Sequence, residues 1–94
     1  MLLDRFSMDG KVALVTGAGR GIGRGCALAF AETGARIVCA ARTAEQVEDT
    51  AAEAKRLGVE SLSVICDVSE AEQRQNLIDQ TLKRFGRIDV LVNN

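Results

Sequence analysis

Thr16-Gly17-Ala18-Gly19-Arg20-Gly21-Ile22-Gly23 is the stretch that decides how this chain folds. It follows an apolar run at residues 12–15 and opens a helical pattern from about Ile22 to Thr33. A continuous apolar run is typical of a strand that is covered on both faces of a sheet. The order of strand, glycine turn and helix start therefore predicts a parallel α/β unit with a ligand site at the turn.

Three of the glycines in this stretch have separate uses. Gly17 lets the chain turn sharply, Gly21 leaves room for a pyrophosphate at the backbone, and Gly23 lets the helix pack close to the strand. The free backbone N–H groups and the positive end of the helix dipole then face an anion. The alternative is a tight strand-to-helix turn that binds no ligand.

The rest of the chain repeats the alternation of strand and helix. We predict strands at 11–16, 36–41, 61–66 and 88–92, and helices at 22–33, 44–57 and from just after Ser69 to Phe85. This alternation implies right-handed crossovers and a doubly wound parallel sheet, a Rossmann-like α/β fold with strand order 3-2-1-4. The sheet is incomplete in these 94 residues, and its ligand is expected at the carboxyl ends of the strands.

Local signals refine the three helices. The positions of the first helix that we expect to face the core are Ile22, Cys26, Ala29 and Phe30. Gly25 costs this helix about 1 kcal/mol relative to alanine, so we expect another segment to pack closely against it. Thr43 with Gln46, and Ser69 with Glu72, have the spacing of capping boxes at the starts of the second and third helices.

The composition is that of a globular protein without a strong charge. Hydrophobic residues make up 47% of the chain, which is enough for a packed core, and the net charge of -1 gives no general attraction to nucleic acid or membrane lipid. No apolar run approaches the roughly 20 residues of a membrane span, and residues 1–5 lack the basic start and apolar centre of a signal peptide. We therefore predict a cytoplasmic protein with no nucleic-acid or membrane partner.

Missing residue types limit the chemistry of the chain. There is no His or Tyr, so the commonest general base, the commonest zinc ligand and the phenol group are absent. Cys26, Cys39 and Cys66 are odd in number and lie in apolar patterns, which favours buried free thiols over disulfide bonds or metal ligands. We expect no metal site and no catalytic residue within these residues.

The glycine stretch, the end of the third strand and the end of the chain carry further motifs. Asp67-Val68 directly follows the third strand, Asp89-Val90-Leu91-Val92-Asn93-Asn94 closes the chain, and residues 85–89 lead into that closing run. With the spacing Thr16-Gly17-x-x-x-Gly21-x-Gly23, these features resemble the short-chain dehydrogenase/reductase (SDR) family and the start of its Asn-Asn-Ala-Gly motif. The resemblance covers nearly the whole chain. It implies that residues 1–94 are the N-terminal part of a single NAD(P)-binding Rossmann domain.

The resemblance implies a role for individual residues. The pyrophosphate and the adenosine ribose would be surrounded by Gly17, Gly19, Gly21, Ile22 and Gly23. Asp67 would bond the adenine amino group, and Val68 would line the adenine pocket. Asn94 would meet the adenosine ribose and hold the end of the fourth strand. In the alternative interpretation, Asp67 is a helix-entry residue and Asn94 is a turn residue.

The end of the second strand predicts which nicotinamide cofactor is bound. NAD-selecting sites usually place Asp or Glu about 20 residues after the glycines, where the carboxylate bonds the ribose 2′-hydroxyl. Ala41 stands at that position and Arg42 follows, so a guanidinium would meet a 2′-phosphate instead. Arg20 lies in the glycine stretch, and basic residues at both positions accompany NADP preference in the resembling family. The prediction is NADP(H), with NAD(H) as the alternative cofactor and solvated surface arginines as the alternative interpretation.

The resemblance implies an NADP(H)-dependent oxidoreductase that moves a hydride between nicotinamide and a small-molecule alcohol or ketone, as a homodimer or homotetramer. The family's catalytic Ser, Tyr, Lys and Asn lie beyond Asn94, so we expect a longer chain and name no catalytic residue. One alternative is a nucleotide-binding half-domain or an SDR-like sensor without catalysis. Another is a methyltransferase that uses S-adenosylmethionine. Such an enzyme would need an acidic residue at the end of the second strand to hold the ribose hydroxyls, and Ala41-Arg42 at that position argue against it.

Overall fold

The computed structural model describes residues 8–94. Four strands and three helices alternate along these residues: β1 (Val12–Thr16), α1 (Gly21–Glu32), β2 (Arg36–Ala41), α2 (Ala44–Arg56), β3 (Ser61–Ile65), α3 (Ala71–Phe85) and β4 (Val90–Val92). Every predicted element is present. The largest difference is at β4, which begins at Val90 rather than Ile88.

The strands form one parallel sheet with the order β3-β2-β1-β4, as predicted. Its register places Val12 beside Arg36, Ala13 beside Val90, and Ile37 beside Ser61. All four strands therefore end at the same edge of the sheet, where the turns that follow them come together.

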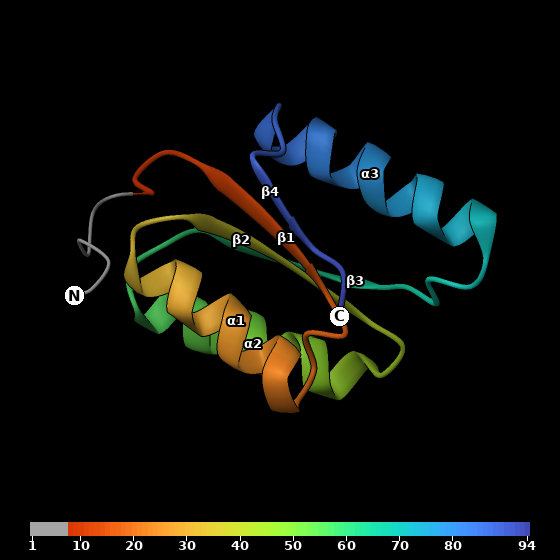
Figure 1. The fold of residues 1–94 in the computed structure, drawn as a ribbon, viewed down its shortest axis with the longest axis horizontal. Helices are drawn as coiled ribbons and strands as arrows, with labels where there is room; N and C mark the ends of the chain where they lie inside the picture. The colour runs from red at the N-terminus through yellow and green to blue at the C-terminus, as the bar shows by residue number, and fades with distance from the viewer. Residues whose placement is uncertain (1–7) are drawn as a thin grey trace.

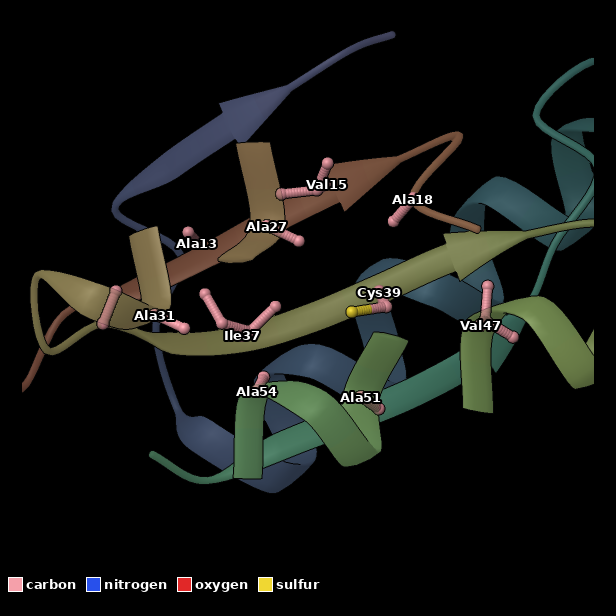
Figure 2. Packing of buried hydrophobic residues seen from close by; sticks show 11 residues of the cluster. Ala13, Val15, Ala18, Ala27, Ala31, Ile37, Cys39, Val47, Ala51 and Ala54 are labelled. Atoms are coloured by element: carbon pink, nitrogen blue, oxygen red, sulfur yellow. The ribbon is translucent and has the colours of Figure 1, made fainter. Parts of the chain in front are cut away.

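Helices cover both faces of the sheet: α1 and α2 lie on one face, and α3 lies on the other (Figure 1). Every residue of β1 is buried, which explains why its sequence is apolar without alternation. The core beneath α1 and α2 consists of Ala13, Val15, Ala18, Ala27, Ala31, Ala35, Ile37, Cys39, Val47, Ala51 and Ala54, which are drawn as sticks in Figure 2. The core beneath α3 consists of Val12, Leu14, Val38, Ala40, Val64, Cys66, Leu77 and Phe85.

The face of α1 that meets the sheet differs from the prediction. The buried residues of this helix are Gly23, Ala27 and Ala31, whereas Ile22 is 78% exposed and Ala29 is also exposed. Cys26 and Phe30 pack only against the margin of the core. Small residues lie on the buried stripe because they let the helix approach β1 and β2 closely. The prediction instead chose the larger apolar residues that stand one position before them in the sequence.

Three local predictions about the helices are wrong. A Cβ atom on Gly25 would meet no atom within 4 Å, so nothing packs closely against this glycine. Thr43 is the N-cap of α2 but makes no side-chain capping bond. The N-cap of α3 is Glu70 rather than Ser69, and the Ser69 hydroxyl donates to Asp67.

The cysteines are free thiols, as predicted, although Cys26 is only half-buried. Among residues 8–94, no group of three or more His, Cys, Asp or Glu side chains is arranged to hold a metal ion. None of the helices in this part of the chain has the length and apolar character needed to cross a membrane.

Candidate functional site

A cleft of about 350 Å³ lies at the carboxyl ends of β1, β2 and β3. It is lined by Gly17, Gly19, Arg20, Ala41, Arg42, Thr43, Gln46, Cys66, Asp67, Val68, Ser69 and Asn94. Most of the residues predicted to form the site therefore meet in one place, although they come from four separate turns. The other predicted residues, Gly21, Ile22 and Gly23, form the first turn of α1 beside the cleft.

The backbone of the glycine stretch requires glycine at specific points. Gly17 and Gly21 have φ angles of +62° and +61°, in the left-handed region that favours glycine. A Cβ atom on Gly23 would lie 2.0 Å from the carbonyl oxygen of Gly17, so α1 can start this close to β1 only with glycine there. A Cβ atom on Gly21 would meet nothing within 4 Å, which leaves that side of the turn open to a ligand.

The start of α1 presents backbone N–H groups that have no acceptor among residues 8–94. These groups belong to Gly21, Ile22 and Gly23, while the next N–H, of Arg24, donates to the Arg20 carbonyl. Arg20 is the N-cap and makes no capping hydrogen bond, and the first turn contains no acidic side chain. Orphan N–H groups at the positive end of a helix dipole fit a phosphate group.

The end of β4 is tied to the glycine turn. The backbone N–H of Asn94 donates to the hydroxyl of Thr16 at 3.1 Å, and its side-chain Nδ2 donates to the Gly17 carbonyl at 3.4 Å. A Cβ atom on Gly17 would lie 2.9 Å from the same Nδ2 atom. The side chain of Asn94 therefore packs against the turn that begins the glycine stretch.

Asp67 places a carboxylate in the cleft just after β3. Its Oδ1 atom accepts hydrogen bonds from the Ser69 hydroxyl at 2.7 Å and from the Ser69 backbone N–H at 3.0 Å. These bonds lower the pKa of Asp67, and the positive charge of Arg42 lowers the pKa further. Asp67 is thus an ionised acceptor at neutral pH, available to a hydrogen-bond donor such as an amino group.

Two arginines border the cleft on different turns. Arg20 precedes α1 and Arg42 follows β2, and both are exposed. Ala41, where an NAD-selecting site would carry a carboxylate, is half-buried at the end of β2. This side of the cleft is therefore suited to an anionic group.

Sequence reasoning missed the residues that support the glycine stretch from α2. A Cβ atom on Gly19 would lie 2.7 Å from Cβ of Gln46 and 2.8 Å from its Oε1 atom. Thr50, one turn further along α2, donates to the Ala18 carbonyl at 2.9 Å. One signal was available: α2 starts at the same sheet edge as α1, so its first turns must lie beside the glycine stretch.

The chain matches the short chain dehydrogenase family over residues 11–94. It therefore belongs to that family. An uncharacterized oxidoreductase of Mycobacterium tuberculosis is 39% identical to it over 94 residues, which are 100% of this chain and 36% of that protein.

Solved structures share the fold. A metagenomic short-chain oxidoreductase in complex with NADP is 41% identical, with a TM-score of 0.88 over 94% of this chain and 40% of that one. An NAD+-bound xylitol dehydrogenase is 40% identical, with a TM-score of 0.88 over 90% of this chain and 33% of that one. The Rossmann-like arrangement is thus established. The chain spans between 33% and 40% of the length of these three proteins.

Proposed function

We propose that these residues belong to an NADP(H)-dependent oxidoreductase that transfers a hydride between nicotinamide and a small-molecule alcohol or ketone. This proposal rests on the row of N–H groups at the start of α1, beside the cleft, which have no acceptor within residues 8–94. When bound, the dinucleotide supplies the hydride acceptor or donor. The residues described above bind and orient it.

The site residues are assigned by their chemistry and position. Backbone groups of Gly17, Gly19, Gly21, Ile22 and Gly23 hold the pyrophosphate and the adenosine ribose. Asp67 accepts a hydrogen bond from the adenine amino group, and Val68 lines the adenine pocket. Asn94 contacts the adenosine ribose while its backbone keeps β4 attached to Thr16. The shared cleft and the ionised state of Asp67 support this assignment.

NADP(H) is proposed over NAD(H) because of the charges at the cleft. Arg42 and Arg20 would attract the 2′-phosphate, whereas no carboxylate stands at the end of β2 to bond a ribose 2′-hydroxyl. Similar proteins are described with either cofactor, one with NADP and one with NAD+. The preference therefore rests on the two arginines.

The wider organisation is part of the same proposal. Residues 1–94 form the N-terminal part of one NAD(P)-binding Rossmann domain, and the catalytic Ser, Tyr and Lys lie outside them. The protein acts in the cytoplasm as a homodimer or homotetramer. Free thiols at Cys26, Cys39 and Cys66 suit the reducing conditions of that compartment.

The proposal is tested by incubating the intact protein with NADPH and a panel of ketones and aldehydes. We expect substrate-dependent oxidation of NADPH, followed by nicotinamide absorbance, and slower oxidation of NADH. Binding of NADPH without turnover of any carbonyl compound would favour a sensor or a half-domain. Failure to bind either dinucleotide would overturn the proposal.

A further inference from the structure

We propose that Thr50 of α2 and Arg24 of α1 are positioning residues that hold the glycine stretch in the form that receives the pyrophosphate. The inference rests on the function proposed above, and it adds residues that do not line the cleft themselves. It comes from a hydrogen-bond network, centred on a buried hydroxyl, that joins α1, α2 and the backbone between β1 and α1.

The Thr50 hydroxyl is the centre of this network. The side chain is fully buried, and its oxygen accepts a hydrogen bond from Nη1 of Arg24 at 2.9 Å. Because arginine can only donate, the hydroxyl proton must go to a carbonyl group. Two carbonyls are in reach, Ala18 at 2.9 Å and Gln46 at 3.1 Å.

The bond to Ala18 fixes the backbone of the glycine stretch, because both the N–H and the carbonyl group of Ala18 are hydrogen-bonded. Its N–H donates to the Ala40 carbonyl of β2 at 3.1 Å, and its carbonyl receives the Thr50 hydroxyl. Ala18 is buried and lies outside the helices and strands. No other hydrogen bond within residues 8–94 reaches its carbonyl oxygen, so Thr50 satisfies a group that would otherwise be buried without a partner.

Because the peptide unit is planar, fixing the Ala18 carbonyl also fixes the direction of the Gly19 N–H. The peptide bond between Ala18 and Gly19 is trans, so the Gly19 N–H points away from the side on which Thr50 holds the carbonyl. That N–H has no acceptor among residues 8–94, and Gly19 lines the cleft. Gln46 lies beside the same residue, where an added Cβ atom would come within 2.7 Å of the Gln46 Cβ atom, so Gly19 has little room to move toward α2. The donors are therefore oriented before a ligand arrives, which lowers the entropic cost of binding.

Arg24 makes the network continuous with α1. Its Nη1 atom contacts both Thr50 and Oδ2 of Asp49, each at 2.9 Å. The Asp49 side chain is 66% exposed, so the ion pair is of the surface kind that contributes little. We expect the contact between Arg24 and the buried Thr50 hydroxyl to contribute more to positioning, because it directs the hydroxyl proton toward the carbonyls.

A matched control separates positioning from ordinary stability. Thr81 in α3 is also fully buried and donates to the carbonyl four residues earlier, Leu77, at 2.8 Å. It lies on the opposite face of the sheet from α1 and α2 (Figure 1). Thr81→Val therefore removes a comparable helical bond without touching the glycine stretch.

The test is calorimetric titration of the intact protein with NADP+ and NAD+, using whichever dinucleotide the wild type binds more tightly. We expect Thr50→Val to raise Kd about tenfold, as for loss of a bond that leaves a buried carbonyl unsatisfied, with kcat less affected than the KM for the dinucleotide. Thr50→Ser keeps the hydroxyl and should stay within about twofold of wild type, as should Thr81→Val.

A second set of variants, at Arg24 and Asp49, tests the same inference even if Thr50→Val folds poorly. Arg24→Met should raise Kd about threefold or more, whereas Asp49→Asn should leave it within about twofold. In the double variant Arg24→Met/Thr50→Val the effects should be less than additive, because both act through the Ala18 carbonyl. Equal Kd values for Thr50→Val and Thr81→Val, or an unchanged Kd for Arg24→Met, would overturn the inference. Absence of dinucleotide binding by the wild type would instead overturn the proposed function.

Discussion

The carboxylate of Asp89 accepts a hydrogen bond from the backbone N–H of Val12 at 2.8 Å, and the Asp89 N–H donates to the Val12 carbonyl at 2.9 Å. This pair of bonds lies where β4 begins to run beside β1, one residue before the pairing of Ala13 with Val90. Arg87 holds the other carboxylate oxygen at 2.7 Å. Asp89 thus sets the register of a strand of only three residues, whose end carries Asn94 to the glycine turn.

Removing this carboxylate should weaken the attachment of β4. We expect Asp89→Ala to lower Tm by several degrees, and Arg87→Ala, which removes only an exposed ion pair, to lower it less. Arg87 and the Val12 N–H lower the pKa of Asp89, so its stabilisation is present above the ordinary carboxyl pKa and is lost as pH falls. Thermal melts across the acidic range should show less pH dependence for Asp89→Asn. An equal Tm for Asp89→Ala and Arg87→Ala would contradict this role.

Two glycines in α1 should respond in opposite ways to alanine. Gly23→Ala places a methyl group against the Gly17 carbonyl, so α1 must shift away from β1, and we expect lower stability and loss of dinucleotide binding. Gly25→Ala meets open space in the same helix and should stabilise the protein by about 0.5–1 kcal/mol through helix propensity. Denaturant unfolding measures both changes. Destabilisation by Gly25→Ala would show that this glycine has a packing role after all.

Reversing the charge of Arg42 should change cofactor preference. In Arg42→Asp a carboxylate would repel the 2′-phosphate, and we expect NADP+ affinity to fall about 10- to 100-fold, with a smaller change for NAD+. The matched control is Lys55→Asp, the same change of charge near the other end of α2. Fluorescence titration with both dinucleotides measures the ratio. Equal losses for the two dinucleotides in Arg42→Asp would refute the assignment of this residue to the 2′-phosphate.

The cysteines should differ in reactivity. Burial raises the pKa of Cys39 to about 12, so its thiolate fraction at pH 8 is on the order of 10⁻⁴. Cys26 is only half-buried and should be alkylated first, with Cys39 and Cys66 protected until the protein unfolds. Peptide-level mass spectrometry after timed alkylation gives the rate for each cysteine. Labelling of native Cys39 as fast as Cys26 would mean that the core beneath α1 and α2 opens readily.

The fold could be predicted from the sequence because local and global signals agree. The apolar run of β1 has no alternation, and both faces of that strand are in fact covered. The turn at Gly17 and the close contact at Gly23 were predictable because few other sequences allow a strand to pass so directly into a helix. Alternation and handedness predicted a parallel sheet, and the order 3-2-1-4 followed from the doubly wound Rossmann pattern.

Contacts between distant residues could not be predicted in this way. Thr50 and Ala18 are 32 positions apart, and Arg24 and Asp49 are 25 apart, so no periodicity connects them. The buried face of α1 was misassigned because alanine and glycine carry little weight in a hydrophobic pattern, although their small size is what places them there. Ser69 was expected to cap α3, but its hydroxyl had a nearer partner in Asp67.

The same limit applies within the candidate site. Arg42 was predicted from its place after the second strand, Arg20 from its place in the glycine stretch and Asp67 from the family resemblance, and the structure brings all three to one cleft. Gln46 lines that cleft as well, yet its sequence context indicated only a capping box. Its position beneath Gly19 depends on how α2 crosses α1, which is a property of the packed structure.

The central claim is that backbone N–H groups at the start of α1 bind the pyrophosphate of a nicotinamide dinucleotide. The most direct test is an NMR titration of the ¹⁵N-labelled intact protein with NADP+, following the amide resonances of Gly19, Gly21, Ile22 and Gly23. We expect these amides to show the largest saturable shifts, together with slower amide hydrogen exchange. Saturable binding that leaves these four amides unchanged would contradict the account, as would the absence of any shift with NADP+ or NAD+.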